Sequence, residues 1–242
     1  MDEALVEVVS RGGRADVVLR TGMLSPRLLG VRGRRARVAL VAATASLLGG
    51  DHCRFRVRVG AGCRLDLTDV AGTVAYDGRG ARARWSVAVE AGPDAVLTWA
   101  GEPFVIAAGA DVHRCGVVEL AAGARVLLRE QLVLGRHAEP PGRLVARTEA
   151  TVAGEPLLVE EIAEPLPGGA GRPDGLSGTP RVLDSVLALG WRPPADPHAF
   201  VLAGPGAVRR ILAQQAHAAD LTAAWLRWMA SLDAAPSGPA PM

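Results

Sequence analysis

A phrase of about 30 residues that recurs along the middle of the chain constrains the fold more than any other feature. Each copy has two short runs in which apolar and other residues alternate, and a turn of small residues joins the two runs. The turn ends in a glycine, which is Gly62, Gly92 or Gly123 in the three copies. A weaker fourth copy contains Gly154. Two short strands cannot bury an apolar face alone, but stacked copies can, so this period is typical of a solenoid or layered β array. We therefore predict a mainly β fold of stacked, solenoid-like strand repeats.

The segments around the repeats complete the predicted organisation. Short apolar runs broken by glycines precede them, which extends the β-rich stacked-repeat unit over residues 1–164. Residues 165–180 are rich in Gly and Pro and predict a loop. Residues 181–233 are expected to form a small α-helical part that packs on the β unit. Residues 234–242 are expected to be a disordered tail.

The C-terminal part contains one clear helical pattern and one ambiguous segment. Over residues 206–231, apolar side chains recur mostly at spacings of three and four, which predicts an amphipathic helix with a break near Asp220. The spacing over residues 181–189 fits a helix, but the β-branched residues there leave a strand open. Trp225 and Trp228 either cap the end of the β stack, which the pattern favours, or dock a partner protein.

Composition and motifs exclude several functional classes. The chain has no lysine and therefore no P-loop, and it contains neither a G-x-S-x-G elbow nor an H-E-x-x-H zinc motif. A net charge of +2 in a chain rich in Gly, Ala and Pro gives no sign of nucleic-acid binding. The densest basic cluster, between Arg27 and Arg37, is predicted to protect a sheet edge. We therefore expect a protein that is not an enzyme and binds no nucleic acid.

Soft metal ligands cluster only at His52-Cys53 and His113-x-Cys115. Both histidines lie ten residues before a repeat glycine, so the stack would place them in equivalent positions two strands apart, about 9–10 Å between backbones. Arg82 is predicted in the slot between them, which opposes a closed zinc site. Carboxylates are scattered through the repeats instead, and those that point inward need hydration or ion pairing.

The cysteines and the N-terminal segment indicate a cytoplasmic protein. Three cysteines without a C-x-x-C pair fit a reducing compartment better than a disulfide framework. The first residues lack the basic and hydrophobic regions of a secretory signal, and the apolar run at residues 38–48 is too short to span a bilayer. We therefore expect no membrane association.

Several short motifs follow one another in a fixed order along residues 5–162. They are LLGGD at 47–51, GAG at 60–62 with LDLT at 65–68, AY at 75–76, LTW at 97–99 with EP at 102–103, GA at 109–110, Glu130 and LGR at 134–136. Together they resemble the family of the urease accessory protein UreD, also called UreH. The likeness continues more faintly through residues 208–227.

The resemblance implies a helically stacked β scaffold that acts as a non-enzymatic chaperone in nickel insertion into apo-urease. The implied partners are apo-urease on one side and an assembly of UreF with the GTPase UreG on the other. No cofactor is implied as permanently bound; nickel is implied to pass through an internal tunnel. Such a conduit suits carboxylates, because oxygen ligands bind Ni(II) less tightly than imidazole or thiolate ligands and so release it.

Matching positions carry the family's polar residues onto this sequence. The resemblance suggests Asp51, Glu102 and Glu130 for the transient nickel path, and Thr68 and Tyr76 as further family-matched polar positions. A turn or strand-edge role stays open for Asp51, Thr68 and Tyr76.

The sequence also departs from the family pattern. Val74 stands where a lysine is expected, and Ala100-Gly101 replaces a Leu-Pro pair before Glu102. Two other functions therefore stay open. One is a ligand- or carbohydrate-binding β-solenoid module, for which aromatic platforms are scarce. The other is service to a different metalloenzyme.

Overall fold

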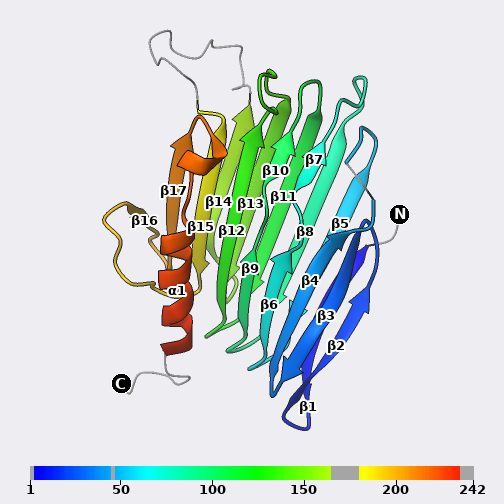
Figure 1. The fold of residues 1–242 in the computed structure, drawn as a ribbon. Coiled ribbons are helices and arrows are strands. Elements are labelled where there is room, and N and C mark those ends of the chain that lie inside the picture. The colour runs from blue at the N-terminus through cyan, green and yellow to red at the C-terminus, as the bar shows by residue number, and fades with distance from the viewer. Residues whose placement is uncertain (1–2, 45–46, 165–179, 235–242) are drawn as a thin grey trace.

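The structure is a computed structural model that describes residues 3–44, 47–164 and 180–234 (Figure 1). Its strands are β1 Ala4–Arg11, β2 Arg14–Arg20, β3 Leu24–Arg32, β4 Arg35–Ala42, β5 His52–Val59, β6 Arg64–Asp69, β7 Thr73–Ala75, β8 Ala83–Ala91, β9 Val96–Ala100, β10 Phe104–Ile106, β11 Asp111–Leu120, β12 Arg125–Leu134, β13 Arg143–Val152, β14 Glu155–Glu164, β15 Val182–Leu189, β16 Ala199–Val201 and β17 Gly206–Ala213. The short 3-10 helix η1 Ala216–Ala218 and the helix α1 Thr222–Ala234 follow them.

The strands form two sheets, and each repeat contributes one strand to each of them. The seven-stranded sheet has the order β14-β13-β11-β8-β5-β1-β2. The ten-stranded sheet has eight strands in the order β16-β17-β15-β12-β9-β6-β4-β3, and its other two strands lie off this path, where β10 pairs in parallel with β12 and with β7. Successive repeat strands pair in parallel in both sheets: β8 lies between β5 and β11 and pairs with both, and β9 lies between β6 and β12 and pairs with both. Figure 1 shows the sheets stacked face to face along the length of the molecule. The predicted solenoid-like β fold is confirmed.

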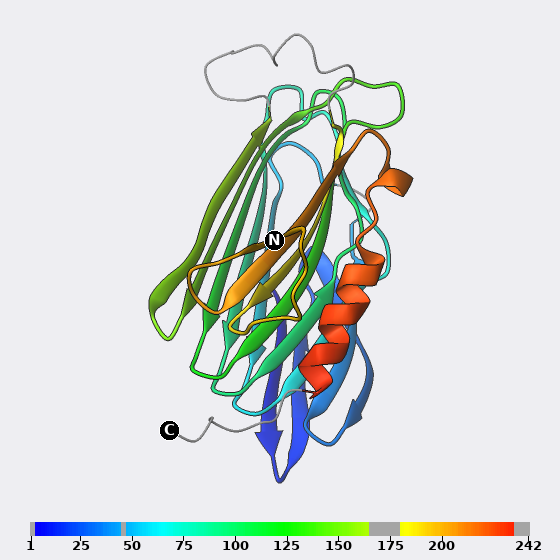
Figure 2. The same ribbon diagram turned by 90° about the vertical axis from the view of Figure 1, so that its left-hand side faces the viewer.

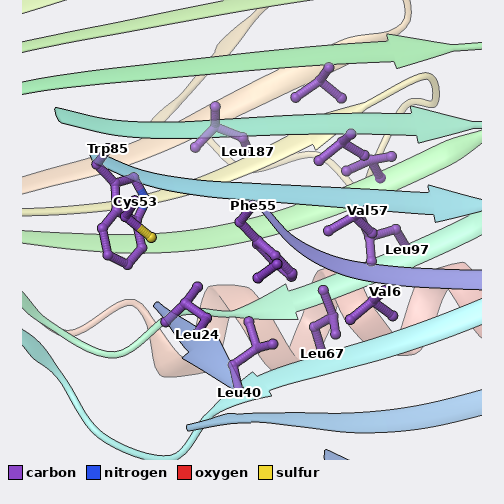
Figure 3. Packing of buried hydrophobic residues seen from close by; sticks show 14 of the residues in the cluster. Val6, Leu24, Leu40, Cys53, Phe55, Val57, Leu67, Trp85, Leu97 and Leu187 are labelled. Carbon is purple, nitrogen blue, oxygen red and sulfur yellow. The ribbon is translucent and has the colours of Figure 1, made fainter. Parts of the chain in front are cut away.

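The main core fills the space between the two sheets. Side chains alternate along each strand, and the apolar set of every repeat points inward, as Figure 3 shows for Phe55, Val57, Leu67 and Leu97. Leu97 is fully buried, and the ring of Phe55 meets that of Trp99 edge to face with 5.4 Å between centroids. We call the pair of strands that one repeat contributes, one in each sheet, a coil of the solenoid. Rows of apolar contacts that repeat from one coil to the next therefore hold the stack together.

The register of the repeats differs by two residues from the one predicted. Strand pairing aligns Val59 with Ala91, so the second-copy residue equivalent to Gly62 is Asp94 and not Gly92. Asp94 has φ of +55°, close to the +61° of Gly62. Aspartate adopts this left-handed conformation more readily than most residues, which hides the turn from a search for glycine. Gly92 is small for another reason, because a Cβ there would lie 3.0 Å from the backbone nitrogen of the facing coil.

The predicted fourth repeat is a hairpin and not a coil. β13 and β14 pair antiparallel within the seven-stranded sheet. The two residues between them, Ala153 and Gly154, have φ of +51° and +85°, as in a two-residue turn of type I′. The chain therefore stays in one sheet, and the place beside β12 in the other sheet is taken by the antiparallel strand β15.

Residues 206–213 are strand β17, so the helix predicted over residues 206–231 is wrong in its first part. β17 pairs with β15 along its whole length, which also resolves residues 182–189 as a strand. The sheet is covered on both faces here: Val208 packs into the main core, while Ile211 packs under α1. Apolar residues on both faces imitate helical spacing. The expected helical part 181–233 is thus three strands followed by η1 and α1.

The expected break near Asp220 corresponds to the start of α1. The side chain of Asp220 accepts a hydrogen bond of 2.8 Å from the backbone N–H of Thr222. The arginine-rich segment from Arg27 to Arg37 forms β3 and β4, and β3 is the edge of the ten-stranded sheet, as predicted. Residues 165–179 and 235–242, where a loop and a tail were expected, lie outside the described residues.

A buried ion-pair network fixes α1 on the outer face of the ten-stranded sheet, where Figure 2 shows it. Asp184 of β15 is fully buried and accepts hydrogen bonds from Nη2 of Arg129 (2.8 Å) and from the backbone N–H of Leu221 (3.0 Å). Arg129 also donates to Asp220 (3.0 Å) and to Thr222 (2.9 Å). One arginine therefore joins β12, β15 and the N-terminus of the helix.

Candidate functional site

A cavity of about 120 Å³ lies between the two sheets, within the repeats. Strands of both sheets line it, β8, β11 and β13 on one side and β6, β9, β12 and β15 on the other. The polar and aromatic side chains of its lining that matter below are Asp69, Trp99, Glu102, Phe104, Arg114 and Glu130. The lining of this cavity combines apolar side chains with carboxylates and arginines from both sheets.

An inward-facing row of the ten-stranded sheet supplies two of the carboxylates, Asp69 and Glu130. Thr68, Ala100 and Arg129 are paired neighbours, so Asp69, Gly101 and Glu130 follow them one position further along. Beyond Glu130 the same row continues to Ser185 and Arg210. A Cβ on Gly101 would lie 2.7 Å from the carbonyl oxygen of Arg129, so only glycine fits between the two acidic positions.

Asp69 is a partly buried carboxylate held by neutral donors. The indole N–H of Trp99 donates to Oδ1 (2.9 Å), and the backbone N–H of Glu102 donates to Oδ2 (3.1 Å). Burial raises the pKa of Asp69, and these two hydrogen bonds oppose that rise only in part. In the described residues no arginine side chain makes a hydrogen bond or ion pair with its oxygens.

Glu130 is paired with an arginine from the opposite sheet. Nη1 of Arg114 in β11 lies 2.5 Å from Oε1 of Glu130 in β12. The guanidinium group also stands over the ring of Phe104, 4.6 Å from its centroid. Phe104 in turn meets Trp85 edge to face at 5.3 Å. The pair therefore bridges the two sheets across the cavity.

A second ion pair crosses between the sheets at the end of the row. Arg210 of β17 makes a two-pronged contact with Glu160 of β14, with 2.8 Å from Nη2 to Oε2, and its Nε donates to Ser185 (2.9 Å). Such paired hydrogen bonds fix both side chains. The row thus ends in a closed contact between the edges of the two sheets.

Of the residues predicted from the sequence, the structure brings Glu102 and Glu130 together at this cavity. Asp51 lies elsewhere and stabilises a turn, where its Oδ2 accepts from the backbone N–H of Leu48 (2.8 Å). Thr68 is exposed on the strand before Asp69. Tyr76 lies under the guanidinium of Arg136, 5.3 Å from its carbon to the ring centroid.

The site residues that were not singled out are Asp69, Trp99 and Arg114. The alternation of Leu65 and Leu67 already places Asp69 on the inward face of its strand, which is a signal available in the sequence. No local signal marks Arg114, because its role depends on which residue of the opposite sheet faces it.

Trp225 and Trp228 belong to the chain's own core, so they do not present a docking surface. They are 7% and 0% exposed and pack with Leu127, Val186 and other side chains between α1 and the ten-stranded sheet. The cap interpretation therefore describes them, and the docking one does not.

His52 of β5 and His113 of β11 occupy equivalent positions two strands apart in the seven-stranded sheet, and Arg84 of β8 lies between them rather than the expected Arg82. Burial and nearby arginines lower the pKa of both imidazoles, in His52 through Arg54 and Arg84 and in His113 most through Arg82. Across the described ranges, no three His, Cys, Asp or Glu side chains gather closely enough to hold a metal ion.

The sequence profile of the family described as UreD urease accessory protein matches residues 22–233. A urease accessory protein UreD 1 of Streptomyces griseus is 45% identical over 214 residues, which cover 87% of this chain and 84% of that protein. A urease accessory protein UreD of Streptomyces coelicolor is 38% identical over 230 residues, covering 88% and 91%. In the part of the chain that the structure describes, no helix has the length and apolar character needed to cross a membrane.

Proposed function

The chain belongs to the UreD family of urease accessory proteins, and on that premise we propose that it takes part in inserting nickel into apo-urease. In this proposal the stacked β unit is a cytoplasmic scaffold between urease and an assembly of UreF with the GTPase UreG. It binds no permanent cofactor, and Ni(II) is its cargo. It acts as an accessory protein and not as an enzyme.

The observation that carries the proposal is the charged cavity between the sheets. Asp69 and Glu130 are partly buried and belong to the same row, and Glu102 is an exposed residue beside that row. The three carboxylates offer a divalent ion several oxygen ligands around one cavity. We propose this row as the nickel path, with Asp69 in the place that Asp51 was expected to fill.

Each carboxylate of the proposed path would bind Ni(II) only weakly, which suits a protein that passes the ion on better than one that stores it. Oxygen ligands bind Ni(II) less tightly than nitrogen or sulfur ligands, and a conduit must release its cargo. The described residues hold no ready-made cluster of three metal ligands. The cavity between the sheets is also smaller than the roughly 300–1,000 Å³ of pockets that hold drug-sized ligands, so this cavity does not suit a bound carbohydrate.

The test is nickel incorporation by variants of the row. Asp69→Asn and Glu130→Gln keep side-chain shape but remove charge, and we expect urease activated with them to contain roughly tenfold less nickel, the size of effect seen when residues around metal sites are replaced. Glu149→Gln is the matched control, because Glu149 lies on the exposed side of β13 in a pair with Arg147.

The measurement is the nickel content of urease after activation with the complete set of accessory proteins, together with co-purification of the complex. Unchanged nickel content with both row variants would contradict the proposal. So would loss of complex assembly in those variants, because the carboxylates would then be structural.

A further inference from the structure

We infer that Arg114 competes with the metal ion for Glu130 and so limits how long nickel stays in the cavity. The inference rests on the function proposed above and adds a residue that sets the affinity of the path. An arginine is a permanent cation, and two cations cannot share one carboxylate without strong repulsion. The position that Arg114 occupies at Glu130 is the one that a nickel ion entering the row needs.

The contact between Arg114 and Glu130 is close but poorly anchored. Nη1 lies 2.5 Å from Oε1, yet neither Nη1 nor Nε of Arg114 makes a hydrogen bond of good geometry, and both atoms are buried. The arginine is therefore held mainly by charge and by the face of Phe104. A contact that lacks aligned hydrogen bonds gives up less when another cation replaces it.

Two other partly buried arginines are held in a different way. Arg210 makes a two-pronged contact with Glu160 and a further bond to Ser185. Arg129 donates to Asp184 through both Nε and Nη2. Arg129 and Arg210 hold their carboxylates through aligned hydrogen bonds, whereas another cation can replace Arg114 at Glu130.

The neighbours of Arg114 support an exchange in both directions. Asp69 has only Trp99 and a backbone N–H on its oxygens, so a cation can contact it without displacing an arginine. When that cation moves on to Glu130, the ring of Phe104 remains as a partner for the displaced guanidinium. When Arg114 returns to Glu130, it expels the cation. Glu130 can therefore bind the cation for a time but does not retain it.

The direct test is nickel affinity of the full-length protein, measured by equilibrium dialysis against Ni²⁺ alone. Arg114→Met removes the charge and keeps most of the length. We expect Ni²⁺ to bind roughly tenfold more tightly, because the repulsion between the guanidinium group and the metal ion at Glu130 is then absent. In the complete activation reaction, the same variant is expected to deliver nickel to apo-urease more slowly than the wild type.

Two further substitutions at the same position separate charge from fold. Arg114→Gln is neutral but polar and is expected to tighten binding as Arg114→Met does, which keeps the test available if the methionine variant does not fold. Arg114→Lys keeps the charge and is expected to bind Ni²⁺ within about twofold of the wild type, because a cation still faces Glu130. Arg147→Met is the control for loss of an arginine from the neighbouring strand β13, since the side chain of Arg147 is exposed and pairs with Glu149 on the outer side of that strand.

The inference is overturned if the neutral variants bind Ni²⁺ no more tightly than the wild type, or if Arg147→Met tightens binding equally. Failure of the underlying function looks different. In that case Asp69→Asn and Glu130→Gln leave both nickel binding and nickel delivery unchanged. If those two variants lower both quantities while the Arg114 variants change neither, the conduit stands and only the competition by Arg114 is wrong.

Discussion

The repeated coils and the C-terminal closing unit of this molecule are stabilised by different interactions. In the coils, parallel strands β5 to β12 stack through rows of apolar side chains, each residue above its equivalent in the next coil. In the closing unit, β15 and β17 run antiparallel, and charged contacts through Arg129 and Arg210 connect them to their surroundings.

The difference shows how register is specified in each region. A coil finds its place because the coil before it offers the same pattern, so non-specific apolar contacts suffice. The closing unit has no such template. A buried ion pair is a weak source of stability but a strong source of specificity, because any other register leaves a charge unpaired.

The largest expected effect comes from breaking the closing unit at Asp184. Asp184→Ala leaves the buried guanidinium of Arg129 without its main partner, and we expect the free energy of unfolding to fall by about 3–5 kcal/mol. Asp220→Ala removes an exposed partner of the same arginine and is expected to lower the free energy of unfolding much less, because solvent screens an exposed ion pair. Urea denaturation of the two variants measures both. Equal losses would mean that burial of the pair does not matter.

A smaller effect is expected from a truncation in the coils. Leu97→Ala creates a cavity in the fully buried row of β9 and is expected to cost about 2–5 kcal/mol, depending on how far the neighbouring coils collapse into it. Leu97→Met conserves volume and should cost less than about 1.5 kcal/mol. If both substitutions cost the same in urea denaturation, the coils do not depend on apolar packing as described.

The smallest expected effect concerns a charged network within the coils, which are otherwise held by apolar contacts. Asp66 is at its centre. Burial raises the pKa of Asp66, but contacts with Arg35, Arg64 and Thr98 outweigh it and hold that pKa below the ordinary value. A lowered pKa means that the stabilisation is complete above about pH 4 and is lost as pH falls through the folded-state pKa.

Asp66→Asn is therefore expected to cost about 1 kcal/mol at neutral pH, and the difference from the wild type should shrink below about pH 4. Thermal unfolding across pH measures this. Asp16→Asn, in an exposed pair with Arg11, is the matched control for removing one surface carboxylate. A difference for Asp66→Asn that grows as the pH falls would contradict the assignment.

Much of the coil architecture could be predicted because its signals are local. Alternation and a turn residue with positive φ recur in each copy, and both are visible in the sequence. The register error at Gly92 arose because Asp94 adopts the conformation that glycine holds at Gly62. The turn therefore requires a residue that adopts positive φ, and both glycine and aspartate meet that requirement.

The closing unit was harder to predict because its character depends on contacts between distant segments. β17 looks helical in isolation, since Val208 and Ile211 serve two different cores on opposite faces of one strand. Glu102 and Glu130 could be named as candidates for the cavity by family likeness. Arg114 could not, because its pairing with Glu130 joins two sheets whose relative register no local pattern encodes.

The hairpin at Ala153 and Gly154 has a consequence for how proteins of this architecture can change in size. By keeping the chain in one sheet, it ends the series of coils and lets an antiparallel strand close the other sheet. The row of positions that includes Asp69 and Glu130 therefore grows only in whole steps of one strand spacing, about 4.8 Å. A duplication of one repeat before the hairpin would lengthen the interior row by one side chain and leave both ends intact. The hairpin thus marks the end of the repeats, and the length of the interior row is set by the number of coils before it.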